Sequence, residues 1–223
     1  MEKLIKLQLA LFFENPVSRP DSLMNGINSD LGNLFDAMPQ IHPIPMEAPQ
    51  DIPRVQMSSE NGRYNCNIAS SRIDFILSAD LGGEFDWPEI TKDFIAKTTL
   101  FINSVFSGTK IVRFGLIGNF FIPDKSASST LTRKYLKIDL NSAEEINLRF
   151  NKNSSSYGLS LNNISSINTA IRETNEGHEK GVFIELDINN IPKLELLKSD
   201  TLVQLIEKHM PLFSPEKVKG LIK

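Results

Sequence analysis

The sequence is poor in the residue types that build disulfides and metal sites. Cys66 is the only cysteine among 223 residues, which also include three histidines. One cysteine forms no intrachain disulfide, and it excludes a zinc site with several cysteine ligands. None of the histidines has a second histidine or a cysteine at metal-ligand spacing, so we expect no metal and no cofactor. A reducing compartment fits this composition best, and we expect a cytoplasmic protein.

Long apolar runs and an excess of positive charge are also missing. No stretch reaches the roughly 18 apolar residues that a membrane-spanning helix requires, so we expect no membrane association. The apolar run 7–13 follows two lysines, as in a signal peptide, but Glu14-Asn15-Pro16 comes after it instead of a cleavage site with small residues. We therefore predict a first β-strand there.

The charge balance bears on nucleic acid as a partner. The 24 basic and 27 acidic side chains give a net charge of −3, whereas nucleic-acid-binding proteins usually carry a basic excess that neutralises phosphates. Nucleic acid is therefore not an expected partner. If it did bind, we would expect a basic face that contains Lys125, Arg133, Lys134, Lys137 and Lys152.

The first half of the chain alternates between strand and helix patterns. Its hydrophobic periodicity predicts strands over 4–13, 54–58, 64–69, 72–79 and 110–123, and helices over 21–38 and 87–108. Asn61-Gly62 predicts a two-residue hairpin turn. Asp86 is the expected N-cap of the second helix, with Glu89 in the capping-box position. Five prolines in the segment 39–53 predict an extended connector.

The second half is more polar and again places strands before helices. Strands are expected around 146–150, 157–161 and 181–188, and helices from Asp200 and from Ser214. We predict an α+β fold in which antiparallel β-sheets are packed by a few helices, with two related β-rich halves. The halves are 1–124 and 125–223, and they can form one compact domain. The sequence contains no clear internal repeat.

Two polar residues stand out in the strand predicted over 110–123. Both alternating sets of this strand are largely apolar, which predicts a central strand that is buried on two faces. Arg113 and Asn119 then lie among apolar neighbours, and a buried guanidinium needs a partner. The structural interpretation pairs Arg113 with a core carboxylate such as Asp74 or Asp86, and we favour it. The functional interpretation gives it an anionic ligand in a cleft.

Other candidates have ordinary structural explanations. His209 lies near the end of the last main helix, where the helix dipole or a core hydrogen bond favours histidine. Cys66 alternates with apolar residues in a strand and is expected in the core. We retain Arg113, Asn119 and His209 as candidate binding residues and identify no catalytic residue. The polar tract 147–168 is a second place where a packing explanation is weak.

The chain resembles one family, by an order of elements and not by a catalytic motif. The shared elements are an opening strand over 4–13, a hairpin at Asn61-Gly62, a helix from Trp87, the strand sequence Arg113-Phe114-Gly115-Leu116-Ile117-Gly118-Asn119, and His209 with Phe213 at a helix end. In these it is similar to sporadically distributed, uncharacterised bacterial and phage proteins of about this length. The resemblance implies an accessory protein of mobile-element or defence-related neighbourhoods, without an assigned activity.

Two classes of function fit these observations. The absence of clustered catalytic residue types favours a non-enzymatic binding or interaction protein, whose partner is an unknown protein or a second copy of the chain in a homodimer. Self-association is reasonable because the edge strands of such a sheet must be covered or paired. The alternative is a hydrolase or transferase whose site is assembled from distant residues, with Arg113 and His209 in one cleft.

Overall fold

The computed structural model describes residues 3–45, 47–79, 86–138, 140, 143–174, 177–192 and 195–223. Its strands form one antiparallel sheet, and their bounds are β1 Lys3–Phe13, β2 Gln40–Ile41, β3 Val55–Ser58, β4 Tyr64–Ile68, β5 Arg72–Ser78, β6 Ile111–Pro123, β7 Asn147–Ser156, β8 Leu159–Thr174 and β9 Gly177–Asn190. The α-helices are α1 Met24–Asp30, α2 Trp87–Gly108, α3 Ala127–Leu131, α4 Ser199–His209 and α5 Pro215–Gly220. Shorter helical turns cover η1 Pro20–Leu23, η2 Thr132–Leu136 and η3 Met210–Phe213. The predicted α+β class is confirmed. Among the helices of the described residues, none is long and apolar enough to cross a membrane.

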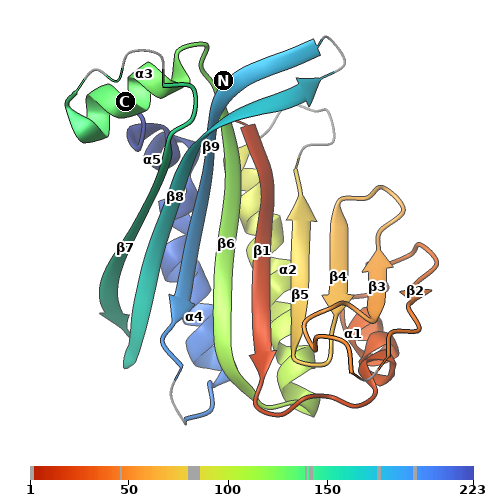
Figure 1. The fold of residues 1–223 in the computed structure, drawn as a ribbon. Helices are drawn as coiled ribbons and strands as arrows, with labels where there is room; N and C mark the ends of the chain where they lie inside the picture. The colour runs from red at the N-terminus through yellow and green to blue at the C-terminus, as the bar shows by residue number, and fades with distance from the viewer. Residues whose placement is uncertain are drawn as a thin grey trace.

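The sheet is built from two units with the same topology. Its strand order is β2-β3-β4-β5-β1-β6-β9-β8-β7. In the first unit β1 is followed by β3, β4, β5 and α2, and in the second unit β6 is followed by β7, β8, β9 and α4. The two opening strands, β1 and β6, pair antiparallel at the centre of the sheet (Figure 1). The units meet between Gly108 and Ile111, so β6 opens the second unit, although a division at residue 124 would assign it to the first half.

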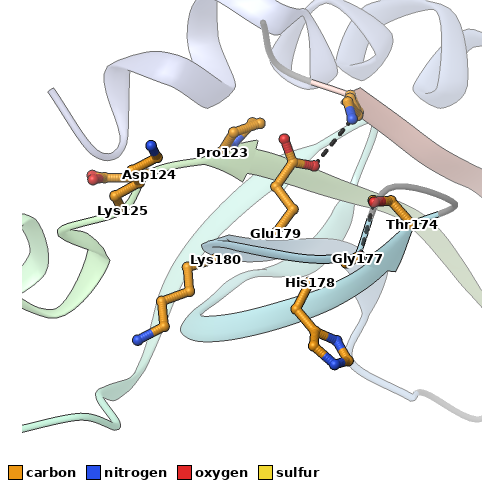
Figure 2. A pocket seen from close by; sticks show the side chains of 9 residues that line it. Pro123, Asp124, Lys125, Thr174, Gly177, His178, Glu179 and Lys180 are labelled. Atoms are coloured by element: carbon orange, nitrogen blue, oxygen red, sulfur yellow. Dashed lines mark hydrogen bonds and ion pairs between the residues drawn. The ribbon is translucent and has the colours of Figure 1, made fainter.

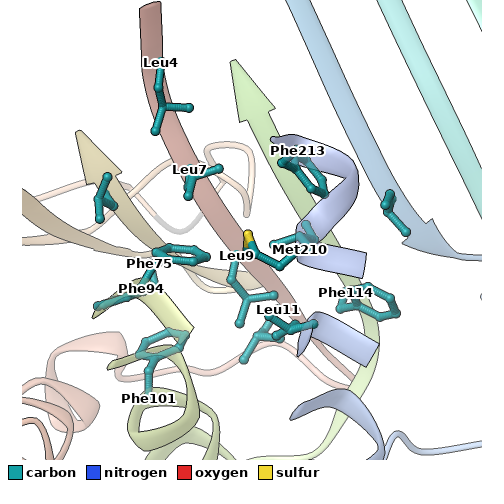
Figure 3. Packing of buried hydrophobic residues seen from close by; sticks show 14 of the residues in the cluster. Leu4, Leu7, Leu9, Leu11, Phe75, Phe94, Phe101, Phe114, Met210 and Phe213 are labelled. Carbon is teal, nitrogen blue, oxygen red and sulfur yellow. The ribbon is translucent and has the colours of Figure 1, made fainter. Parts of the chain in front are cut away.

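The hydrophobic core lies on one face of this sheet, under α2 and α4, which lie behind the strands in Figure 1. Alternate residues of β1 point toward these helices, and Leu7, Leu9 and Leu11 are fully buried. Phe75 of β5 stacks on Phe101 of α2 with ring centroids 5.0 Å apart. Figure 3 shows these side chains together with Met210 and Phe213, which follow α4. The period-two alternation in the strands thus sends one set of side chains into a single helix-covered core.

A glycine in β6 allows the C-terminal segment to approach the sheet. A Cβ atom added at Gly118 would lie 2.5 Å from Cδ1 of Phe213, whose side chain is fully buried. Gly118 pairs with Leu7 of β1 and therefore lies on the helix-covered face. The missing side chain is what lets the Phe213 ring pack directly on the central strands.

Several local predictions are corrected. The helix predicted over 21–38 is shorter, consisting of η1 and α1, because Gly32 and Asn33 adopt positive φ angles of 68° and 60° and end it. The turn at Asn61-Gly62 is not a two-residue turn: the Ser59 amide donates to the Tyr64 carbonyl, and only Gly62 of the two has a positive φ. The loop that connects β3 and β4 is therefore longer, covering the five residues 59–63. Asp86 is at the N-cap of α2, but its side chain makes no capping hydrogen bond.

The prediction that β6 is buried on two faces holds only in part. β6 is central, between β1 and β9. Helices cover only the face that carries Phe114 and Leu116, whereas Arg113 and Ile117 alternate with them and are half-buried on the other face. The sequence pattern was misleading because apolar Ile117 and Phe121 also belong to that second set.

We predict that Gly118→Ala lowers the free energy of unfolding by about 1–3 kcal/mol, because the new methyl group overlaps the buried Phe213 ring. Urea unfolding measures this change. Gly26→Ala in α1 is the matched control, since its Cβ would meet nothing within 4 Å, and it should leave stability equal or higher. A Gly118→Ala protein as stable as the wild type would contradict the packing described here.

Candidate functional site

The face of the sheet opposite α2 and α4 carries the unusual polar groups of the molecule. We call it the open face. It is the face seen in Figure 1, where β1, β6 and β9 run uncovered at the centre. The strand register places on it one line of residues across the sheet, from β5 to β9, formed by Asp74, Ala10, Gly115 and Asn189.

Hydrogen bonds connect polar side chains of β1 and β5 into a first polar row. Lys6 Nζ donates to Gln8 Oε1 at 3.0 Å, and Gln8 Nε2 donates to Asp74 Oδ1 at 2.9 Å. Arg72 Nε donates to the other carboxylate oxygen of Asp74, also at 2.9 Å. Burial raises the pKa of Asp74, although the Arg72 charge and these hydrogen bonds act in the opposite direction. Both oxygens of this buried carboxylate are therefore satisfied within the protein.

Beside this row, two arginines flank one aromatic ring. Phe12 of β1 lies directly opposite Arg72 on β5 and Arg113 on β6. The guanidinium carbons of Arg72 and Arg113 lie 5.7 Å and 5.0 Å from the centre of the ring. Such contacts stabilise a guanidinium and orient it without neutralising its charge. Arg113 is therefore held in place by stacking, and the predicted pairing with Asp74 or Asp86 is wrong for Asp74, which binds Arg72.

A second polar row crosses β7, β8 and β9. Asn151 Nδ2 donates to Asn162 Oδ1 at 3.0 Å, and Asn162 Nδ2 donates to Asn189 Oδ1 at 3.1 Å. Asn189 Nδ2 donates to Asp187 Oδ2 at 2.9 Å. The row thus begins at an exposed amide on the edge strand and ends at a partly buried carboxylate in the centre of the sheet.

The carboxyl group of Asp187 has a raised pKa. Burial is the largest cause, and it is opposed by the hydrogen bond from Asn189. The charge of Glu185 raises the pKa further, whereas the charge of Arg113 lowers it. Asp187 Oδ1 lies 3.7 Å from where a Cβ atom of Gly115 would be, so the carboxyl group lies over this residue of β6. Asp187 thus leans over the central strand toward Arg113.

Three buried polar atoms of the open face have no hydrogen-bond partner among the described residues. They are Arg113 Nε, Asn119 Oδ1 and Asp187 Oδ1. Asn119 uses its amide nitrogen to donate to Glu185 Oε2 at 3.2 Å, but its oxygen is left over. Buried polar atoms are nearly always paired in native proteins, and each exception needs an explanation. Here the exceptions gather on the neighbouring strands β6 and β9.

The structure brings together two of the three candidate binding residues. Arg113 and Asn119 lie on the same face of β6, six residues apart. His209 ends α4, on the opposite side of the sheet, so Arg113 and His209 do not form one cleft. Burial, and then the charge of Lys208, lowers the pKa of His209, and its Nε2 atom has no partner among the described residues.

The pockets elsewhere on the surface are weaker candidates for a binding site than the open face. The largest described, about 990 Å³, lies at the end of β6, beside the last residue of β8 and the first residues of β9. Its Lys3 is paired with Glu179 at 3.1 Å, and the side chains of Lys180 and His178 point in different directions (Figure 2). Within the described ranges, no group of three or more histidine, cysteine, aspartate or glutamate residues is arranged to hold a metal ion.

A further cluster fixes the β3–β4 hairpin to α2. Tyr64 donates its hydroxyl to Asp93 Oδ2 at 2.5 Å, and Lys97 binds the other carboxylate oxygen. Burial raises the pKa of Asp93, but the hydrogen bonds from Lys97 and Tyr64 and the nearby cations outweigh it and leave the pKa lowered. Every polar group of this cluster has a partner, so we assign it a structural role.

Comparison with known proteins does not extend this picture: no family model matches the sequence, and no curated protein matches it. The resemblance to uncharacterised bacterial and phage proteins therefore stays a prediction.

The sequence analysis did not identify Gln8 and Asp187 as residues of the open face. It named Asp74 as a possible partner of Arg113 but not as a member of the first polar row. A signal was present in the strand 181–188, where Glu185, Asp187 and Asn189 alternate with apolar residues. Alternation identifies the face of such residues but not the strand beside them, and the site depends on which strands are neighbours.

The raised pKa of Asp187 predicts a pH dependence of stability. A carboxyl group whose pKa is higher in the folded state contributes stability that is lost as pH rises through that folded value. We expect the free energy of unfolding of Asp187→Asn, relative to wild type, to increase as pH rises from about 4 toward 8. Urea unfolding at a series of pH values measures the difference, and a constant or falling difference would contradict the burial of this carboxyl group.

Proposed function

We propose that the chain is a non-enzymatic binding protein that holds an extended segment of a partner protein across its open face. The observation that carries this proposal is the set of three buried, unpartnered polar atoms on Arg113, Asn119 and Asp187. These atoms are shielded from solvent, so a ligand reaches them when neighbouring side chains move aside, and pairing with them would remove the free-energy cost of leaving them unsatisfied.

The chemistry of the three atoms favours a ligand that has both donors and acceptors. Arg113 Nε is a donor, Asn119 Oδ1 is an acceptor, and Asp187 Oδ1 can act as either, depending on protonation. Arg113 and Asn119 are six residues apart on one strand, which corresponds to about 20 Å. A polypeptide in extended form presents N–H and C=O groups in alternation over such a distance, which matches this arrangement.

The charge distribution argues against a polyanion. Carboxylates of Asp74, Glu185 and Asp187 are interleaved on the open face with the cations of Lys6 and Arg113. A phosphate backbone needs an uninterrupted positive surface, since its affinity comes from neutralisation. The same mixture of signs suits a polypeptide, whose sequence can place opposite charges in register.

The arrangement of carboxylates gives little support to a hydrolase. Asp74 and Asp187 both have raised pKa values. They lie on β5 and β9, which are three strand spacings apart in the sheet, or about 14 Å. Catalytic carboxylate pairs of glycosidases are about 5 to 9.5 Å apart. Combined with the placement of His209 behind the sheet, this spacing favours binding over catalysis.

A cytoplasmic location and a bacterial or phage origin are part of the same proposal. Cys66 is free and buried, and burial raises the pKa of its thiol, so it is unreactive. This suits a cytoplasmic protein that needs no disulfide. The resemblance to bacterial and phage proteins suggests that the partner is encoded near it or in its host.

We predict that Arg113→Ala reduces recovery of the partner protein by about tenfold or more, because arginines that stack on aromatic rings are frequent anchors of interfaces. The experiment compares tagged wild type, Arg113→Ala and Arg133→Ala, isolated from native cells after cross-linking and quantified by mass spectrometry.

Arg133→Ala is the matched control, because Arg133 is exposed on η2, away from the open face, and should leave recovery unchanged. Asn119→Ala is a second test in case Arg113→Ala fails to fold, and it should also reduce recovery. Recovery of the bait alone, or of the same proteins with all variants, would overturn the proposal.

A further inference from the structure

The two edges of the sheet differ in how they are protected. At one edge β2 consists of only two residues, and Pro39, Pro43 and Pro45 surround it. Prolines and short length are the usual protection of an edge strand against pairing with another chain. At the other edge β7 has ten residues, with neither proline nor glycine. It pairs with β8 over its whole length without a register shift.

No strand among the described residues pairs with the outer side of β7. All of its residues except Leu148 and Ser156 are exposed. The Thr169 amide donates to the Ile146 carbonyl at 3.0 Å, just before β7 begins. Because backbone groups alternate in an antiparallel pair, the even-numbered residues of β7 bond to β8 and the odd-numbered ones point outward. These outward residues are Asn147, Arg149, Asn151, Asn153 and Ser155.

We propose that β7 pairs antiparallel with β7 of a second copy of this chain, with the two-fold axis at Asn151. In this register Asn151 lies opposite Asn151 of the second copy, Arg149 lies opposite Asn153, and Asn147 lies opposite Ser155. All outward backbone groups of both strands then find partners. The pairing joins the two sheets into one and is independent of any ligand on the open face.

Side-chain charge favours this register over one centred on Arg149. Centring the pair on Arg149 would place two arginines directly opposite each other, which is destabilising. With the axis at Asn151, no like charges face each other. On the opposite face of β7, Lys152 then lies beside Phe150 of the second copy, and this contact occurs twice. Phe150 is 38% exposed and stacks on Tyr135 with ring centroids 5.2 Å apart, so it is already held in position.

The second polar row gives an independent reason for the same axis. Asn151 is its exposed end, and within the described part of the chain Asn162 is the one partner to which its side chain donates. Two Asn151 side chains at a two-fold axis can form reciprocal amide hydrogen bonds. The row would then run without interruption from Asp187 of one copy to Asp187 of the other, and the two open faces would become continuous.

The edges also explain why a closed dimer is the expected assembly. A head-to-tail contact would require β7 to pair with β2, which offers only two residues and is flanked by proline. Pairing of β7 with itself uses the same surface on both copies, so it closes after two chains and leaves only the β2 edges free.

The experiment measures molecular mass by sedimentation equilibrium as a function of concentration. The wild type should approach twice the chain mass of 25.0 kDa. Asn153→Arg places an arginine of each copy opposite Arg149 of the other copy, so two like-charged pairs form. This variant should raise the dimer dissociation constant by about tenfold or more. Asn153→Glu opposes Arg149 with the opposite charge and should lower it. Ser155→Arg is the matched control, because it faces neutral Asn147 and should change little.

Asn151→Pro gives a second test that does not depend on charge. The backbone N–H of Asn151 points away from β8, so proline removes no backbone hydrogen bond within the chain but blocks pairing at the axis. Within the chain it removes the exposed side-chain bond to Asn162, so this variant should be monomeric with a melting temperature close to that of the wild type at low concentration. A wild type that stays monomeric, or a dimer that responds equally to Asn153→Arg, Asn153→Glu and Ser155→Arg, would overturn the proposal.

Discussion

The antiparallel pairing of β1 with β6 is the interaction on which the rest of the structure depends. These strands open the two units of the fold, and their register runs from Lys3–Phe121 to Phe13–Ile111. β1 also pairs with β5, and β6 also pairs with β9, so each unit attaches to the centre through one of them. The helices α2 and α4 then follow the two meanders onto the same face. One helix layer, and therefore one uncovered face, follows from this topology.

On the uncovered face of this nine-stranded sheet, buried polar groups need hydrogen-bond partners within the face, because no second layer supplies them. This protein does so with two hydrogen-bonded rows, one ending at the Asp74–Arg72 pair and the other at Asp187. Between the rows lie the small, buried residues Ala10 and Gly115, and Phe12 supports Arg113. Of the buried side-chain atoms in the rows, only Asp187 Oδ1 has no partner among the described residues, and Arg113 Nε and Asn119 Oδ1 lie unpartnered beside them.

The sequence predicts local elements of this fold better than their assembly. The strands of the first unit follow from alternation, and α2 follows from its apolar stripe between Asp86 and Gly108, because such signals lie within one segment. In the second unit the predicted strands 146–150 and 157–161 cover only part of β7 and β8, because the rest of these strands is rich in asparagine and serine and lacks a regular apolar alternation. The repetition of the two units cannot be predicted from the sequence, because the units share a topology and not matching residues. Arg113 and Asn119 were found because polar groups in an apolar strand are conspicuous. Their surroundings were not, because Phe12 and Asp187 come from strands distant in sequence.

The most direct test of a binding role for the open face is hydroxyl-radical footprinting of the protein isolated from native cells, before and after its partner is removed. Phe12, Ile76 and Ile117 are half-buried side chains of the open face, whereas Leu100 and Leu212 are exposed on helical segments. The account predicts that the partner protects the first group and leaves the labelling of the second group unchanged. Protection of Leu100 and Leu212 with full labelling of Phe12 and Ile117 would contradict it.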